Sequence, residues 1–265
     1  MNSKDFIAVF DSGVGGISVL RHLIRVLPNE RYLYFGDSAN APYGTKTKEQ
    51  VKNLTFAAAE TLMQRGIKAL VVACNTATSA AINDLRAAFP ELIIIGIEPA
   101  LKLAADQFPG GNLGVMATPM TLREEKFAKL MERFENSGTI HKIPAPGLVE
   151  LIETGKADSP ETDALLAKLF APYENLDALV LGCTHYPILY DKIRRYTPSH
   201  IKVITQGEYV GKSLVNYMER HPEMDRMCTK QGTCRFLTTE SGDIFKQYAS
   251  IFFDEDIQVQ SIALK

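Results

Sequence analysis

The pattern of apolar and polar positions divides the chain into short apolar runs and longer segments with helical spacing between them. The runs are rich in β-branched residues, as are strands buried on both faces of a sheet. One of the longer segments ends before Gly66, a residue placed to terminate a helix. Its apolar residues recur on one helical face at Val51, Leu54, Ala58 and Leu62. Strands that alternate with helices in this way indicate parallel sheets with crossover helices.

The apolar runs fall into two series of four. The first series comprises residues 6–10, 32–35, 68–73 and 92–97. The second comprises residues 112–116, 140–143, 178–181 and 201–204. Beyond them we expect a helix over residues 210–220 and a strand over residues 257–262, which complete the first half of the fold.

The two series correspond to each other in register. Residues 7–12 match residues 113–118 at an offset of 106, and the runs before Cys74 and Cys183 match at an offset of 109. We therefore predict an α/β fold of two similar lobes, each a mainly parallel sheet flanked by helices. The predicted first lobe comprises residues 1–97 and 208–265, and the second comprises residues 98–207.

The composition is typical of a soluble globular protein, with 46% hydrophobic and 23% charged residues. A formal net charge of −2 gives no basic surface for nucleic acid, and no apolar stretch suits a signal peptide or a membrane span. We therefore expect a cytoplasmic protein whose four cysteines are free thiols. Cys228 and Cys234 lack a second Cys or His pair at metal-ligand spacing, so no metal site is predicted.

Two cysteines carry the strongest chemical signal. Cys74 and Cys183 each close an apolar run, and each is followed at once by small polar residues that favour a helix start, namely Asn75, Thr76 and Thr184. Helix starts present amides and hydroxyls that bind carboxylates. Two equivalent thiols at two equivalent strand ends suggest a thiol on each side of one substrate, which suits a base on one face and an acid on the other.

The first predicted strand ends in an acidic and glycine-rich segment, Phe10-Asp-Ser-Gly-Val-Gly-Gly. A dinucleotide site is the alternative here, because Asp37 lies 22 residues past Gly15. However, Ser18 stands where the third glycine of that fingerprint belongs, and Asp11 would repel a pyrophosphate. Asp11 is either a helix cap or, as we favour from its place in the same lobe, a partner of the Cys74 thiol.

His185 and a turn add further candidates. His185 stands two residues after Cys183, so its side chain can reach the neighbourhood of that thiol. The turn at Pro42-Tyr43-Gly44 is placed to bring a hydroxyl and an amide to the same cleft.

Assembled, these residues give the chain a close resemblance to the cofactor-independent glutamate racemases, within the aspartate/glutamate racemase superfamily. The similarity covers nearly the whole length. It rests on four motifs: Phe10-Asp-Ser-Gly-Val-Gly-Gly, Pro42-Tyr43-Gly44, Cys74-Asn-Thr-Ala-Thr and Gly182-Cys-Thr-His-Tyr-Pro. One departure is Ala145-Pro146, where the family often has Cys-Pro. It affects the local alignment around Glu153.

The resemblance implies a two-lobed α/β architecture with the active site in the cleft between the lobes. It also implies interconversion of L- and D-glutamate by acid/base thiols, with no cofactor, in a cytoplasmic homodimer that supplies D-glutamate for peptidoglycan. It implies that Cys74 deprotonates D-glutamate and Cys183 deprotonates L-glutamate. Asp11 and His185 would support the respective thiols, and Glu153 would lie near the histidine. The implied substrate-binding residues are Ser12, Pro42, Tyr43, Gly44, Asn75, Thr76, Thr118 and Thr184.

Several alternatives remain open at this level. An aspartate or broad-specificity racemase differs in cleft length, which spacing does not reveal. A Cys-His hydrolase built on Cys183 and His185 leaves Cys74 without a role. A two-lobed amino-acid-binding protein needs no thiols, and a pyridoxal-dependent racemase needs a lysine in a phosphate-cradling context, which we do not find.

Overall fold

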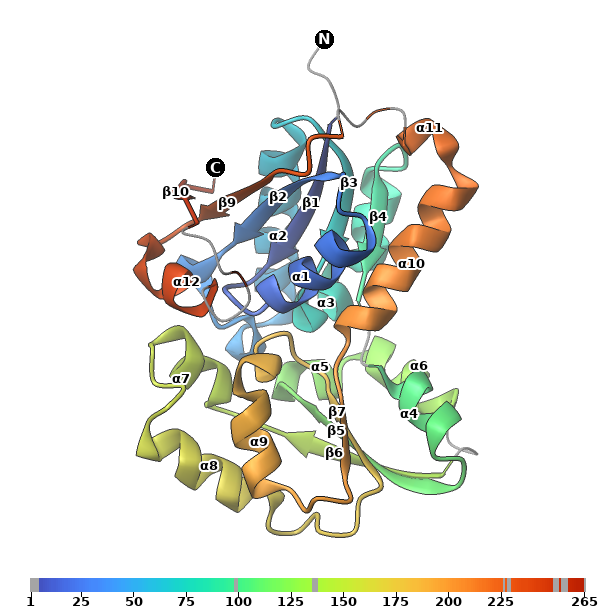
Figure 1. Cartoon of the computed structure of the whole chain (residues 1–265), viewed down its shortest axis with the longest axis vertical. Helices are drawn as coiled ribbons and strands as arrows, with labels where there is room; N and C mark the ends of the chain where they lie inside the picture. The colour runs from blue at the N-terminus through green and yellow to red at the C-terminus, as the bar shows by residue number, and fades with distance from the viewer. Residues whose placement is uncertain are drawn as a thin grey trace.

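The computed structural model describes residues 5–97, 100–134, 138–225, 227, 230–249, 253 and 257–264. Its strands form two sheets, one in the upper and one in the lower half of Figure 1. Every pairing between described strands is parallel, and helices flank both sheets. The predicted α/β fold with two mainly parallel sheets is therefore confirmed.

The first sheet has the strand order β10-β9-β2-β1-β3-β4. Its strands are β1 (Phe6–Asp11), β2 (Arg31–Gly36), β3 (Ile67–Val72), β4 (Ile93–Gly96), β9 (Cys234–Thr238) and β10 (Val259–Ser261). The second sheet has the order β6-β5-β7-β8. Its strands are β5 (Gly111–Ala117), β6 (Gly138–Pro144), β7 (Ala178–Leu181) and β8 (Lys202–Ile204).

Both sheets share one topology. If β5 is counted as the first strand of the second sheet, its order is second, first, third, fourth, the same as β2-β1-β3-β4. In such a sheet the crossovers change direction between the first and third strands, and a ligand site forms at the carboxyl ends of those two strands. The repeated topology agrees with the register correspondence in the sequence.

Helices around the first sheet are α1 (Ile17–Val26), α2 (Lys48–Met63), α3 (Asn75–Ala88), α10 (Gly207–Arg220), α11 (Pro222–Asp225) and α12 (Gly242–Ala249). Helices around the second sheet are α4 (Leu101–Gln107), α5 (Pro119–Arg123), α6 (Glu125–Glu132), α7 (Leu148–Glu153), α8 (Pro160–Phe170) and α9 (Tyr190–Tyr196). Short 3-10 turns lie at η1 (Ser38–Asn40), η2 (Tyr43–Thr45) and η4 (Tyr186–Leu189).

The predicted helix before Gly66 illustrates how local sequence sets an element. Helix α2 begins at a reciprocal cap, in which Thr47 and Gln50 each accept a hydrogen bond from the other's backbone amide. Its predicted apolar face is buried at Val51, Ala58 and Leu62. The chain then turns away at Gly66, whose positive φ of 76° favours glycine.

The predicted strands are confirmed to within two residues at each end. The predicted helix over residues 210–220 is confirmed as part of α10, which begins earlier, at Gly207. Strand β9 was not predicted. It lies between β2 and β10, so the last stretch of the chain extends the first sheet through two strands.

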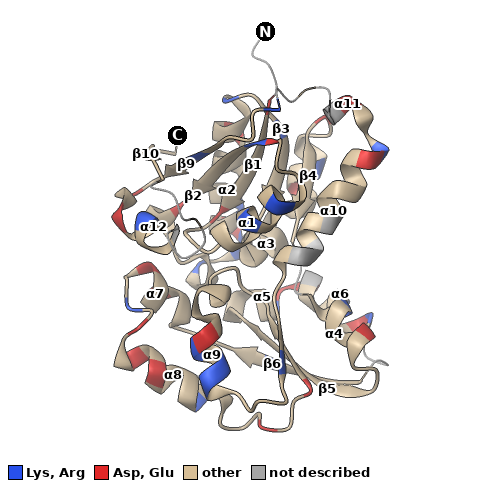
Figure 2. Ribbon diagram, in the orientation of Figure 1, with Lys and Arg blue, Asp and Glu red and all other residues tan. Residues whose placement is uncertain are grey.

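Charged residues of both signs are mixed over the helices of both halves (Figure 2). For example, Lys192 of α9 lies 3.2 Å from the carboxylate of Asp163 on α8. This mixture fits the small formal net charge of −2. Within the described residues, no helix is both long and apolar enough to cross a membrane.

Candidate active site

The topology brings the candidate residues to the carboxyl ends of equivalent strands. Asp11 is the last residue of β1, and Cys74 lies just beyond β3. In the second sheet, Thr118 follows β5 and Cys183 lies just beyond β7. These are the first and third strands of each sheet, where the shared topology predicts a ligand site.

Asp11 is fully buried and connects the two halves. Its Oδ2 accepts a hydrogen bond of 3.0 Å from the Gly16 amide, and its Oδ1 accepts one of 3.1 Å from the Thr184 hydroxyl. Burial raises the pKa of the Asp11 carboxyl above its ordinary value of 3.8; the charge of His185 opposes this shift and that of Glu153 adds to it. Asp11 therefore stabilises the turn before α1, and it also contacts Thr184, the residue that follows Cys183.

Cys74 is the N-cap residue of α3, and only 5% of its surface is exposed. Its Sγ accepts a hydrogen bond of 3.4 Å from the Ala77 amide, and the thiol donates to the Ser12 hydroxyl at 3.5 Å. Burial, followed by the charge of Asp11, raises the pKa of Cys74 from 9.0 to about 12. The charge of Cys183 contributes in the same direction.

Cys183 belongs to a chain of three polar side chains. Its Sγ lies 3.8 Å from Nδ1 of His185, and Nε2 of His185 bonds to the Glu153 carboxylate. The Glu153 carboxylate also accepts a hydrogen bond of 2.9 Å from the Val14 amide in the other half. Burial opposes protonation of His185, but its bonds to Cys183 and Glu153 outweigh that effect and raise the pKa of His185 well above 6.5. The resemblance to the family implied that Glu153 lies near the histidine, and in the structure the two side chains are hydrogen-bonded.

Further contacts between the halves surround the thiols. The hydroxyls of Thr76, Thr118 and Thr121 form a triangle with sides of 3.0 to 3.1 Å. Gly44 lies against Thr118, because a Cβ atom at Gly44 would be 2.8 Å from the Thr118 Cβ. Asn75 donates a hydrogen bond of 2.9 Å to Gln206.

The turn at residues 42–44 lies beside this site, but the Tyr43 hydroxyl is already used. It donates a hydrogen bond of 2.6 Å to Asp37, which is also buried. Pro42 and Gly44 line a small cavity together with Thr118, Ala145 and Pro146. The Ala-Pro pair, which departs from the family pattern, thus faces the predicted substrate-binding turn.

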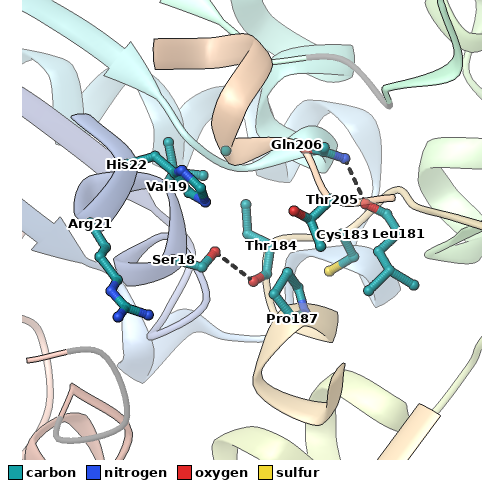
Figure 3. Close-up of a pocket in the computed structure, with 11 residues that line it drawn as sticks. Ser18, Val19, Arg21, His22, Leu181, Cys183, Thr184, Pro187, Thr205 and Gln206 are labelled. Carbon is teal, nitrogen blue, oxygen red and sulfur yellow. Dashed lines mark hydrogen bonds between the residues drawn. The ribbon is translucent and has the colours of Figure 1, made fainter. Parts of the chain in front are cut away.

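A cavity of about 60 Å³ lies beside Cys183 (Figure 3). Ser18 and His22 of α1 line one side, and Thr184 and Gln206 line the other. Cys74 is not part of this lining. Typical small-molecule sites have volumes of roughly 300–1,000 Å³, so this cavity is smaller than a substrate site.

Neither Cys234 nor a group of potential metal ligands extends this site within the described residues. Cys234 is a free thiol in β9, and Cys228 lies outside the described residues. Among the described residues, His, Cys, Asp and Glu side chains do not gather into a group of three that could hold a metal ion.

Two polar residues of this site were not predicted from the sequence, Thr121 and Gln206. Thr121 stands one helical turn after Thr118, and Gln206 follows β8, so both sit near a strand end. The sequence signal for Gln206 is its position just after a predicted strand end, which it shares with Asp11 and Cys74. The backbone amide of Val14, which bonds to Glu153, carries no sequence signal.

Fold and site together define a class of protein: an α/β protein with two parallel sheets of the same topology and one buried thiol after the third strand of each sheet. The sequence profile of the Asp/Glu/Hydantoin racemase family matches residues 8–208, and the chain belongs to this family.

Known relatives support the same assignment. A glutamate racemase of Clostridium botulinum is 48% identical over 215 residues, which cover 80% of this chain and 83% of that protein. The crystal structure of a Bacillus anthracis glutamate racemase has a TM-score of 0.86 at 30% identity and covers 99% of this chain and 98% of that one. Glutamate racemase from Francisella tularensis in complex with D-glutamate has a TM-score of 0.82 at 26% identity, covering 100% and 99%. The resemblance to glutamate racemases is thereby confirmed.

Proposed function

We propose that this chain interconverts L- and D-glutamate by a two-thiol acid/base mechanism that needs no cofactor. The observation that carries the proposal is the placement of Cys74 and Cys183 after equivalent strands of two sheets with the same topology. Racemisation removes a proton from one face of Cα and adds a proton to the other. Two residues on opposite sides do this, one as base and the other as acid, with their roles exchanged by the direction of reaction.

We assign Cys74 to the deprotonation of D-glutamate and Cys183 to that of L-glutamate. With a pKa of about 12, Cys74 is a neutral thiol at rest. Its ionisation at pH 7 costs about 7 kcal/mol, at ~1.4 kcal/mol for each pKa unit. The substrate ammonium, a positive charge brought close to the sulfur, would offset part of this cost, and Asp11 would take up the proton.

The Cα proton is a very weak acid, so the substrate carboxylate has to hold the developing charge. Helix α3 begins directly after Cys74, and its first amides and the Thr76 hydroxyl are suited to bind a carboxylate. Ser12, Thr118 and Thr184 would add hydroxyls from both halves. Tyr43 would act through its main chain, since its hydroxyl is bonded to Asp37.

Binding requires the two halves to separate. The backbone segments around Gly13 and Gly15 press against Glu153 and His185, and the cavity beside Cys183 measures only about 60 Å³. Closure around the bound substrate would then exclude water and protect the carbanion-like intermediate from stray protons.

The test is racemisation in deuterated water with protein freed of metal and pyridoxal. We expect either glutamate enantiomer to lose optical rotation and to gain deuterium at Cα. Cys74→Ala and Cys183→Ala should each abolish the loss of rotation. Activity that survives either substitution would exclude the two-thiol mechanism, and faster turnover of aspartate would instead favour the broad-specificity alternative.

We further propose that the enzyme acts in the cytoplasm as a homodimer and supplies D-glutamate for peptidoglycan. Its membership of the racemase family supports this role. Complementation of a D-glutamate auxotroph tests the role, and sedimentation equilibrium tests the dimer. A monomer at all protein concentrations would contradict the second part alone.

A further inference from the structure

Gln206 joins residues next to both thiols. It is the N-cap residue of α10, and only 4% of its surface is exposed. Its Nε2 donates a hydrogen bond of 3.0 Å to the carbonyl of Leu181, two residues before Cys183 (Figure 3). Its Oε1 accepts a hydrogen bond of 2.9 Å from Nδ2 of Asn75, the residue after Cys74.

The Leu181 carbonyl fixes the orientation of both side-chain amides in this series of hydrogen bonds, those of Gln206 and Asn75. A carbonyl oxygen only accepts, so Gln206 has to turn its NH₂ group toward Leu181 and its oxygen toward Asn75. Asn75 then has to turn its own NH₂ group toward Gln206. Its Oδ1 is therefore held on the other side of the amide, where it is buried and has no hydrogen-bond partner among the described residues.

A buried carbonyl oxygen without a partner is costly, and Asn75 is only 3% exposed. The ligand that satisfies it must bring a donor. Glutamate carries a single donor group, its ammonium, because both carboxylates accept at neutral pH.

We infer that Gln206 is a positioning residue that holds Asn75 Oδ1 ready to accept a hydrogen bond from the substrate ammonium. The inference rests on the proposed function. Since Gln206 is anchored to the strand that leads to Cys183, it also fixes this acceptor relative to the second thiol. The ammonium would then be placed the same way for both enantiomers, while the hydrogen on Cα faces one thiol or the other.

The first variant is Gln206→Met, which keeps a similar length and removes both hydrogen bonds. Without Gln206, the Asn75 amide is free to rotate and present its NH₂ group to the ammonium. We expect KM for both glutamate enantiomers to rise about tenfold or more, as for the loss of a hydrogen bond to a charged group. The inhibition constant of glutarate, which lacks the ammonium, should stay within about twofold of wild type.

A double-mutant cycle separates positioning from mere structural support. In an Asn75→Ala background, Gln206→Met should raise KM by no more than about twofold, because the group that it positions is already absent. Thr78→Val is the matched control on the same helix: it removes the buried bonds of Thr78 to Val72 and Ile97 and should leave KM unchanged.

Gln206→Glu supplies a rescue and covers the case in which Gln206→Met does not fold. The ionised carboxylate can still accept from Asn75, but it cannot donate to the Leu181 carbonyl, which repels it, so the anchor that fixes the position of Asn75 Oδ1 is lost. The protonated carboxyl group can donate to Leu181 and accept from Asn75, as Gln206 does. Its KM relative to wild type at the same pH should therefore fall as the pH is lowered. A pH-independent ratio, an unchanged KM in Gln206→Met, or an equal loss of glutarate binding would each overturn the inference. A wild-type protein that does not racemise glutamate would instead overturn the proposed function.

Discussion

Asp11, at the end of β1, accepts a hydrogen bond of 3.1 Å from the hydroxyl of Thr184, which follows β7 in the other sheet. The same carboxylate raises the pKa of Cys74 through its charge. One buried acidic group thus acts on the surroundings of both thiols. A role confined to Cys74, as the sequence suggested, describes only part of what this residue contacts.

We expect Asp11→Asn to slow the two directions unequally. The variant cannot take up the Cys74 proton, so kcat should fall about 100-fold with D-glutamate and less with L-glutamate. The enantiomers have equal free energies, so kcat/KM must remain equal in the two directions, and the asymmetry has to appear in kcat and KM separately. Primary isotope effects with Cα-deuterated substrates should increase mainly for D-glutamate. Equal changes of kcat in both directions would contradict the proposal that Asp11 takes up the proton of Cys74.

The strand ends were predictable because a strand buried on both faces is an uninterrupted apolar run. This placed Asp11, Cys74 and Cys183 at carboxyl ends, and the repeated order of the runs placed the two cysteines in equivalent positions. Strand β9 was not predicted because, with Arg235 second, its sequence is not an uninterrupted apolar run. The strand lies between β2 and β10, and its last three residues are buried.

Contacts between the halves were not predictable from local pattern. The partners Asp11 and Thr184 are 173 positions apart, and Asn75 and Gln206 are 131 apart. No repeating pattern in the sequence indicates that the two residues of either pair are in contact. Tyr43 shows that a correctly predicted turn does not reveal what its side chain contacts. The turn was predicted from the sequence, but the bond of the Tyr43 hydroxyl to Asp37 depends on packing.

The bond between His185 and Glu153 should control a pH dependence of stability. The pKa of His185 is raised well above 6.5, so the folded state binds its proton more tightly than the unfolded state does. The resulting stabilisation is fully present below about pH 6.5 and is lost as the pH rises through the raised pKa. Glu153→Gln removes the negative charge and lowers that pKa.

Denaturant unfolding at several pH values tests this expectation. Wild type should exceed Glu153→Gln most in unfolding free energy near pH 6, and the difference should shrink as the pH rises. Glu150→Gln, one turn earlier on α7, is the matched control and should follow the wild-type pH dependence. A difference between wild type and Glu153→Gln that stays constant with pH would show that Glu153 does not govern the charge of His185.

Gly15 permits a close approach between the backbones of the two halves. A Cβ atom there would lie 2.5 Å from the backbone nitrogen of His185 and 2.6 Å from its Nδ1. Gly15→Ala should therefore displace His185 from Cys183 and lower kcat about 100-fold, the effect of a ~1 Å misplacement. Gly211→Ala is the control. Gly211 lies within helix α10, and the nearest atom to a Cβ there would be a methyl group of Val26 on α1, at 3.3 Å. The Gly211→Ala variant should keep wild-type activity. A Gly15→Ala enzyme with wild-type activity would show that the two halves approach each other less closely around Gly15 than the structure indicates.

Cys74 should make the protein sensitive to alkali. Its pKa is raised from 9.0 to about 12, so above pH 9 the unfolded chain releases this proton while the folded chain retains it. Unfolding free energy should then fall by up to about 1.4 kcal/mol for each pH unit, and by about 4 kcal/mol in total before pH 12. Cys74→Ala lacks this group, so its stability should decline less between pH 8 and pH 10.5 under the same denaturant. Parallel declines in the two proteins would mean that the Cys74 thiolate is as well accommodated in the folded state as in water, and the proposed resting state with a neutral Cys74 thiol would have to be abandoned.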